Sequence, residues 1–199
     1  MKLEPYTRRE LFEQIPDLEN KTILDLASGA FCLYGLTYLE VLGTTVGKDE
    51  VKRYENNVVA IDLEYDPSFG SFLDGTSIKG DAKSLPFRSQ RFNIVAAGKI
   101  FNYFRKNYDE LSRIFDEIDR VLNKDGYLIG DITLFPPLSP NRLLRPHKIA
   151  LYWTSYKRQI KKYSELMEEK RFKFLRKGIG FMPDEITNSL KMFFVTQKE

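Results

Sequence analysis

The apolar residues of this chain form two kinds of pattern, and the two kinds alternate along the sequence. Short continuous apolar runs predict buried strands over residues 21–26, 57–62, 92–97 and 127–132. Apolar residues at helical spacing predict helices over residues 6–15, 34–42, 111–122 and 151–167. The last helix places Trp153, Tyr156 and Tyr163 on one face, which we expect to pack on a sheet. Two further apolar runs, 172–175 and 192–195, predict a closing pair of strands.

Strands that alternate with helices predict a mainly parallel sheet with helices on both faces. The fold class is therefore α/β, Rossmann-like and doubly wound, with a closing antiparallel C-terminal strand. Residues 65–79 contain Pro67, Gly70 and Gly75, so we expect a loop or a shortened helix between the second and third strands. The length of 199 residues predicts a single domain over 1–199, with an inserted loop and a basic helix at about 134–171.

Composition agrees with a folded globular chain, but the charge is unevenly distributed. Hydrophobic residues make up 42% of the sequence and charged residues 30%, which argues against a disordered or fibrous protein. The net charge is only +3, yet residues 142–177 hold twelve Lys or Arg against three Glu. Such a segment is either a solvated helix face or a surface for anionic partners such as RNA.

Several classes of site and location are disfavoured by what the sequence lacks. A single cysteine, Cys32, and a single histidine, His147, argue against a disulfide and against a Cys/His zinc site, so no metal is expected. No stretch approaches the roughly 18 apolar residues of a membrane span. The polar start of the chain does not resemble a signal peptide, and a cytoplasmic location is therefore expected.

Acidic residues follow three of the predicted segments at the places where a ligand would lie. In an open parallel sheet the ligand crevice lies outside the carboxyl ends of the strands. Asp25 ends the first strand, just before the small residues of 27–30, and Asp62 ends the second. A carboxylate there can accept hydrogen bonds from ribose hydroxyls, and Asp81 can accept from an exocyclic amine such as that of adenine. The pattern predicts a site for an adenosine-type cofactor.

Four segments resemble the class I S-adenosylmethionine-dependent methyltransferases, especially the small-molecule branch that includes ubiquinone and menaquinone biosynthesis enzymes. They are residues 23–29 (ILDLASG), 59–62 (VAID), 80–87 (GDAKSLPF) and 120–128 (RVLNKDGYL). The third segment is the most specific. The resemblance extends from about residue 21 to 132, and it implies S-adenosylmethionine as cofactor and methyl transfer to a small-molecule acceptor.

The resemblance also implies roles for individual residues. It places Asp25 near the methionine ammonium, Asp62 at the ribose and Asp81 at the adenine N6, with the backbone of Ala97 and Gly98, at the end of strand 92–97, facing the methionine end. The expected cofactor contacts are Asp25, Ala27, Ser28, Gly29, Asp62, Leu63, Asp81, Ala82, Ala97 and Gly98. On the acceptor side the candidates are Tyr6, Tyr103 and His147, although a structural role explains each of them more readily.

One departure from the family pattern keeps alternatives open. Where the family shows Gly-x-Gly-x-Gly, residues 27–31 read ASGAF, so two glycines are replaced and Phe31 is bulky. A cofactor-binding protein without catalysis is one alternative, and an RNA methyltransferase that uses segment 142–177 is another. Residues 97–103 (AGKIFNY) lack the Asn-Pro-Pro-Tyr arrangement of nucleobase amino methylation, and the absent G-x-G-x-x-G/A fingerprint argues against a dehydrogenase.

Overall fold

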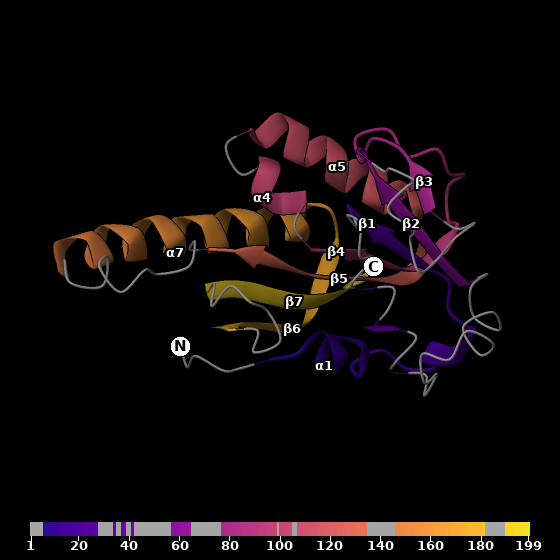
Figure 1. Cartoon of the computed structure of the whole chain (residues 1–199), viewed down its shortest axis with the longest axis horizontal. Helices are drawn as coiled ribbons and strands as arrows, with labels where there is room; N and C mark the ends of the chain where they lie inside the picture. Colours follow the sequence, from indigo (N-terminus) through magenta and orange to yellow (C-terminus); the bar gives the residue numbers. More distant parts are fainter. Residues whose placement is uncertain are drawn as a thin grey trace.

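A seven-stranded sheet with the order β3-β2-β1-β4-β5-β7-β6 forms the centre of the computed structural model (Figure 1). The strands are β1 (Ile23–Leu26), β2 (Val58–Asp62), β3 (Ser77–Lys79), β4 (Phe92–Ala97), β5 (Leu122–Thr133), β6 (Phe172–Phe181) and β7 (Leu190–Lys198). In this order, the first five strands, from β3 through β2, β1 and β4 to β5, pair in parallel. Strand β7 is antiparallel to both β5 and β6. The arrangement confirms the predicted Rossmann-like sheet and its antiparallel C-terminal closure.

The structure describes most but not all of the chain. The described residues are 6–27, 34, 37–38, 41, 57–64, 77–98, 100–104, 107–134, 146–181 and 190–199, with side chains left out at 146–156, 181 and 190.

The strands of the parallel part agree with the apolar runs, with one addition. All four residues of β1 are buried, as expected for a strand covered on both sides. The additional strand is β3, which lies at the edge of the sheet in a segment that we expected to be a loop or a shortened helix. It is only three residues long and partly exposed, so it has no apolar pattern by which it could be recognised.

Two helices begin at side-chain caps. Helix α1 (Arg8–Phe12) starts at a capping box, in which Thr7 Oγ1 accepts from the Glu10 amide at 3.3 Å and Glu10 Oε2 accepts from the Thr7 amide at 2.8 Å. Helix α5 (Tyr108–Val121) starts before the predicted residue 111 because Asn107 Oδ1 caps it, accepting from the Glu110 amide at 3.3 Å. Among the described residues, the other helices are η1 (Leu18–Asn20), α4 (Ile100–Phe104) and α7 (Pro146–Glu169), and residues 34, 37, 38 and 41 are also helical.

Strand β5 is longer than the predicted 127–132 because it contains an irregularity near its start. Leu122 pairs with Phe92 and Tyr127 with Ile94, so residues 123–126 lie opposite a single residue of β4. Asp125 has a φ of 61°, which is a left-handed turn conformation. The turn expected at 124–126 is therefore present, but it lies inside the strand.

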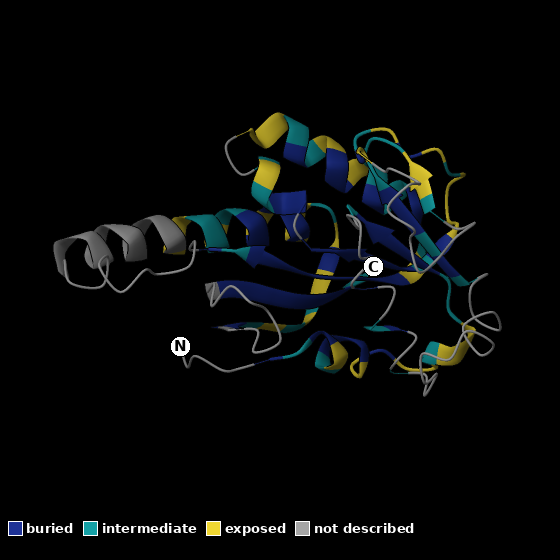
Figure 2. Cartoon of the chain, viewed as in Figure 1, coloured by how far each residue is buried: buried dark blue, intermediate teal, exposed yellow. Residues whose placement is uncertain are grey.

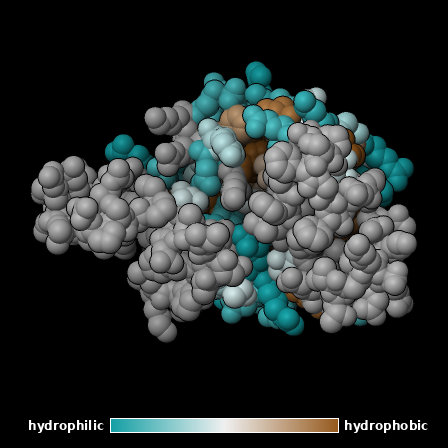
Figure 3. Space-filling view, viewed as in Figure 1, coloured by the Kyte–Doolittle hydropathy of each residue, from teal (hydrophilic) through white to brown (hydrophobic). Residues whose placement is uncertain are grey.

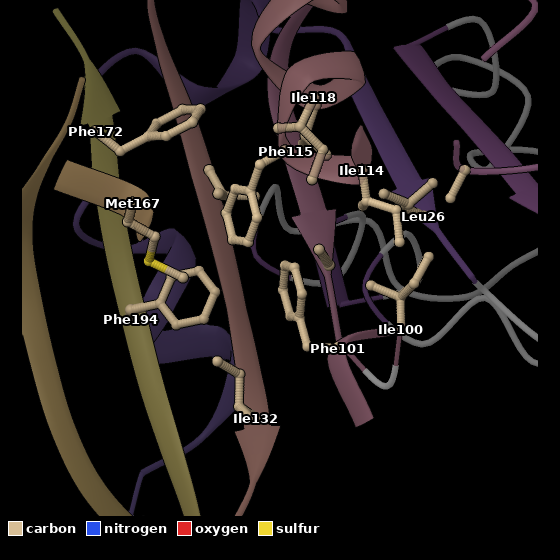
Figure 4. Close-up of a cluster of buried hydrophobic side chains, with 14 of the residues drawn as sticks. Leu26, Ile100, Phe101, Ile114, Phe115, Ile118, Ile132, Met167, Phe172 and Phe194 are labelled. Carbon is tan, nitrogen blue, oxygen red and sulfur yellow. The ribbon is translucent and has the colours of Figure 1, made fainter. Parts of the chain in front are cut away.

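One side of the sheet, which we call the α5 face, is covered by α4, α5 and α7 (Figure 1). Phe101 stacks on Phe115 with ring centroids 5.2 Å apart, and Tyr163 of α7 donates to the Phe101 carbonyl at 2.9 Å. Figure 4 shows this core, and in Figure 2 the strands β4 and β7 beneath it are buried along almost their whole length. The buried Tyr163 confirms that this part of α7 packs on the sheet, whereas the side chains of Trp153 and Tyr156 lie outside the described residues.

The opposite side, which we call the α1 face, is covered by α1 and by the helical residues that follow the first strand. Tyr6 packs on Phe193 of β7 with ring centroids 4.0 Å apart. Tyr38 is fully buried and donates to the carbonyls of Lys21 at 2.6 Å and Leu18 at 3.0 Å. The buried positions described in this helical segment, Tyr34 and Tyr38, are therefore both tyrosines, and Val41 is partly buried.

Candidate functional site

The carboxyl ends of the parallel strands bring the predicted acids to one edge of the sheet. In register, Asp62 lies beside Lys79, two residues before Asp81, and Leu26 lies beside both Ile61 and Ala97. The order along the edge is therefore Asp81, Asp62, the turn after Asp25, and Gly98. Adjacent strands lie about 4.8 Å apart, so this row crosses about 14 Å between β3 and β4.

Side-chain alternation places several of these groups on the same face. Ile23 belongs to the core of the α1 face and Leu24 to the core of the α5 face, so Asp25 points to the α1 face. The same alternation in β2 and β4 places Asp62 and Gly98 on the α1 face. Ala82 and Ala97 pack in the core of the α5 face, so contacts from these two to a cofactor would come from backbone atoms.

Asp62 and Asp81 both shape the backbone beside them. Asp62 Oδ1 accepts from the Glu64 amide at 3.0 Å, and its carbonyl accepts from the Gly80 amide at 2.9 Å. Asp81 Oδ1 accepts from the Lys83 amide at 2.9 Å, and its other oxygen lies 3.8 Å from Lys83 Nζ. Both turns direct a partly exposed carboxylate to the edge of the sheet.

An ion pair on α5 holds the segment that follows Asp81. Arg120 donates to the carbonyls of Leu85 at 2.9 Å and Phe87 at 2.7 Å, and it also binds the Glu117 carboxylate through two nitrogens. Glu117 Oε2 in turn accepts from the Leu85 amide at 2.6 Å. The hydrogen bond from Arg120 lowers the pKa of Glu117, with the Leu85 amide acting in the same direction and burial opposing both. The most specific of the four sequence motifs is thus held in position by a residue pair from another element.

The turn after β1 is described only as far as Ala27. Ala27 has a φ of 57°, which lies in the left-handed region that glycine adopts more readily than alanine. Ser28, Gly29 and Phe31 lie outside the described residues, so their predicted contacts stay predictions. Leu63 follows β2 and is 62% exposed, an accessible position next to Asp62.

The acceptor-side candidates occupy different environments. Tyr103 lies on α4 and is 77% exposed, whereas Tyr6 is buried in the core of the α1 face. The side chain of His147 lies outside the described residues. Between α4 and the end of β5, Asn102 donates to Thr133 Oγ1 at 3.2 Å and accepts from the Thr133 amide at 3.0 Å. This pair joins α4 to the end of β5, and the sequence analysis did not identify it.

A buried polar chain at the same edge was also missed. Lys191 Nζ of β7 lies 3.0 Å from Asp131 Oδ1 of β5, and Asp131 Oδ2 accepts from the Tyr34 hydroxyl at 2.6 Å. Asp131 and Lys191 each interrupt an apolar strand, which is the one sequence signal that marks them. Their pairing could not be inferred because it depends on β7 inserting between β5 and β6.

The basic segment 142–177 is partly neutralised where it is described. Lys161 pairs with Glu165 at 3.5 Å, and Lys170 pairs with Asp116 of α5. Figure 3 shows hydrophilic residues over the outer side of α5 as well. Among the described residues, no cluster of His, Cys, Asp and Glu suits a metal ion. Within the same residues, no helix combines the length and apolar character needed to cross a membrane.

The fold and the row of acids define a methyltransferase-type α/β domain, and comparisons with solved structures agree. A SAM-dependent methyltransferase from Methanosarcina mazei has a TM-score of 0.61 at 16% identity, with 100% of this chain and 99% of that chain covered. MccD protein has a TM-score of 0.63 at 12% identity, with 98% and 96% covered. A 1,6-didemethyltoxoflavin-N1-methyltransferase from Burkholderia thailandensis, solved with 1,6-didemethyltoxoflavin and S-adenosylhomocysteine, has a TM-score of 0.52 at 12% identity, with 89% and 71% covered.

The family is shown by the sequence itself. The model of the methyltransferase domain family matches residues 28–130, just over half of the chain, and this stretch contains Asp62, Asp81 and Gly98. The chain belongs to this family. It is a class I S-adenosylmethionine-dependent methyltransferase with S-adenosylmethionine as its cofactor, which confirms the resemblance. A search of curated proteins finds no match.

Proposed function

We propose that this enzyme transfers the methyl group of S-adenosylmethionine to a small-molecule acceptor. The observation that carries the proposal is the row of acidic and small residues at the carboxyl ends of β3, β2, β1 and β4. Two proteins of similar fold have small molecules or small-molecule biosynthesis in their descriptions, namely the didemethyltoxoflavin methyltransferase and the pyocyanin biosynthetic protein PhzM. These likenesses support the acceptor class without identifying the acceptor.

The chemistry of the row fits the cofactor part by part. Asp81 at the outer end of the row would accept from the adenine amine, and Asp62 on the next strand would accept from the ribose hydroxyls. Asp25 lies buried at the end of β1, on the same face as Gly98, where it would face the positively charged methionine ammonium. The order of these groups along the edge is the order of the cofactor's own parts, from its base to its amino acid.

The acceptor would lie beyond the methionine end, near the ends of β4 and β5. When bound, S-adenosylmethionine supplies a methyl group that its sulfonium already activates. The protein therefore has to orient the acceptor and exclude water more than it has to supply a strong base. Asn102 and Thr133 keep α4 against the end of β5, so that α4 forms a fixed side of this region.

We also propose that residues 1–199 act as one domain, in which α7 belongs to the inserted basic segment at about 134–171. The contacts of Lys161 and Lys170 with carboxylates give no separate support for RNA as the acceptor. Salt-dependent binding of RNA by the purified protein would favour that alternative instead.

Calorimetry with S-adenosylhomocysteine tests the placement of the cofactor. We expect the wild type to bind and Asp62→Ala to lose at least about tenfold in affinity, because hydrogen bonds to a carboxylate are strong. Glu64→Ala is the matched control, since it removes the same charge two residues away and keeps the amide that donates to Asp62. Equal affinities of Asp62→Ala and the wild type would show that the cofactor lies elsewhere, and absence of wild-type binding would overturn the whole proposal.

A further inference from the structure

The chain from Lys191 through Asp131 to Tyr34 is a buried polar arrangement inside an otherwise apolar region. The three residues are 3%, 2% and 4% exposed, and they come from β7, from β5 and from the helical segment after β1. Charged groups are rarely buried to this extent unless they are paired, because removal from water is costly. Each link here is short, at 3.0 Å between Lys191 and Asp131 and 2.6 Å between Asp131 and Tyr34.

Tyr34 serves this chain as a hydrogen-bond donor. Burial raises the pKa of Tyr34 well above its usual value, and the negative charge of Asp131 acts in the same direction. The guanidinium of Arg8, which lies 5.5 Å from the centre of the Tyr34 ring, opposes this only partly. The phenol therefore stays protonated around neutral pH, and it cannot act there as a base.

The ring of Tyr34 lies against Gly98. A Cβ on Gly98 would come within 2.8 Å of Cε2 of Tyr34, so the ring occupies the space that a side chain would need. Gly98 follows β4, and the pairing of Leu26 with Ala97 places it beside Ala27. The Tyr34 ring thus lies against the ends of β1 and β4, which would receive the amino-acid end of the cofactor.

We propose that Lys191, Asp131 and Tyr34 form a positioning chain, which holds the Tyr34 ring against Gly98 and so sets the shape of the subsite for the cofactor's amino-acid end. The proposal rests on the cofactor placement given above. The hydrogen bond from the Tyr34 hydroxyl to Asp131 joins the helical segment after β1 to β5.

Two ligands separate positioning of the amino-acid end from general stability. S-Adenosylhomocysteine carries the amino-acid end, and 5′-methylthioadenosine has the same nucleoside and sulfur without it. In calorimetry, with competition titrations for the weaker ligand, we expect Tyr34→Phe to lose about tenfold in affinity for S-adenosylhomocysteine. Its affinity for methylthioadenosine should stay within about twofold of the wild type, since the nucleoside contacts lie on other strands.

Tyr38→Phe is the matched control. Tyr38 is also buried in this helical segment, but its hydroxyl donates to Lys21 and Leu18, before β1 and at the opposite end of that strand. This variant should leave the ratio of the two affinities unchanged. A second test variant, Gly98→Ala, moves the ring without removing its hydroxyl and should weaken S-adenosylhomocysteine selectively, as Tyr34→Phe does.

Each outcome decides for or against the positioning chain. A selective loss in Tyr34→Phe and Gly98→Ala, absent from Tyr38→Phe, supports it. An equal loss for both ligands, or no loss for either, overturns it while leaving the cofactor placement intact. If wild-type protein binds neither ligand, the proposed function itself fails, and the positioning chain fails with it.

Discussion

The two faces of the central sheet differ in what they contribute. The α5 face buries an almost entirely apolar core of β4, β5, β7, α4, α5 and α7, including the stacked rings of Phe101 and Phe115. The α1 face has an apolar centre as well, but its carboxyl edge carries Asp25, Asp62 and Asp131. The α5 face of the sheet thus contributes mainly to stability, whereas the carboxyl edge of the α1 face carries the groups proposed to bind the cofactor.

Alternation of side chains makes this division possible. Neighbouring residues of a strand point to opposite faces, so a strand such as β1 can bury Leu24 and Leu26 while it directs Asp25 to the other side. Polar groups are tolerated on the α1 face because they are confined to its edge or paired, as Asp131 is with Lys191.

The largest expected effect on stability comes from truncating a buried side chain in the core of the α5 face. Phe115→Ala should lower the free energy of unfolding by about 3–5 kcal/mol, because it leaves a cavity beside Phe101 and Phe172. Urea unfolding measures the loss, and Glu168→Ala on the exposed side of α7 should stay within about 0.5 kcal/mol of the wild type.

Binding measurements on the same variant test the division between the faces. Folded Phe115→Ala should keep its affinity for S-adenosylhomocysteine within about twofold, as expected for distant and independent sites. If its affinity falls as far as that of Asp62→Ala, the two faces are not separate in function.

A smaller effect is expected where the α5 face reaches the cofactor edge. Glu117→Gln weakens the contacts of Arg120 and of the Leu85 amide, and it should cost about 1.5–3 kcal/mol at neutral pH. The folded-state pKa of Glu117 lies below its ordinary value of 4.5, so its contribution to stability is complete above that value and is lost as the pH falls through the lower folded pKa.

Urea unfolding of wild type and Glu117→Gln from pH 7 down to pH 3 follows this loss. The difference between the two proteins should be constant down to about pH 5 and should shrink below about pH 4.5. A difference that stays the same throughout would mean that the glutamate charge contributes nothing to holding residues 85–87.

The smallest effect concerns the strained turn after β1. Ala27→Gly removes the penalty of a φ of 57°, but it also gives the unfolded chain more freedom, so we expect a gain of only up to about 1 kcal/mol. Affinity for S-adenosylhomocysteine should be retained. Gln90→Gly is the matched control, since Gln90 has a φ of 53° in a turn before β4.

Thermal unfolding of both glycine variants measures the gain, and calorimetry measures binding. A loss of cofactor affinity in Ala27→Gly, with none in Gln90→Gly, would show that the alanine itself shapes the site.

The elements with strong apolar patterns were predictable, and those without them were not. Strands β1, β2 and β4 and helix α5 follow their apolar residues closely, because burial on one or two sides determines these positions. Strand β3 was not predicted because a short strand at the edge of the sheet buries few apolar side chains. The extent of β5 was underestimated because residues 124–126 have the sequence of a turn, which predicts that the strand begins after them. In the structure this turn, with Asp125 at a φ of 61°, lies inside β5.

The sequence by itself determined the fold class, the family, the cofactor and the acids expected at the strand ends. The fold class and the strand-end acids follow from local apolar patterns, since an acid at the end of an apolar run reaches the ligand edge of any parallel sheet. The family and the cofactor follow from the resemblance of four sequence segments to the methyltransferases. Only the tertiary structure joined Lys191 to Asp131 and Tyr34, and Arg120 to Leu85. Those partners are far apart along the chain, and their meeting depends on strand order and register, which no local pattern encodes.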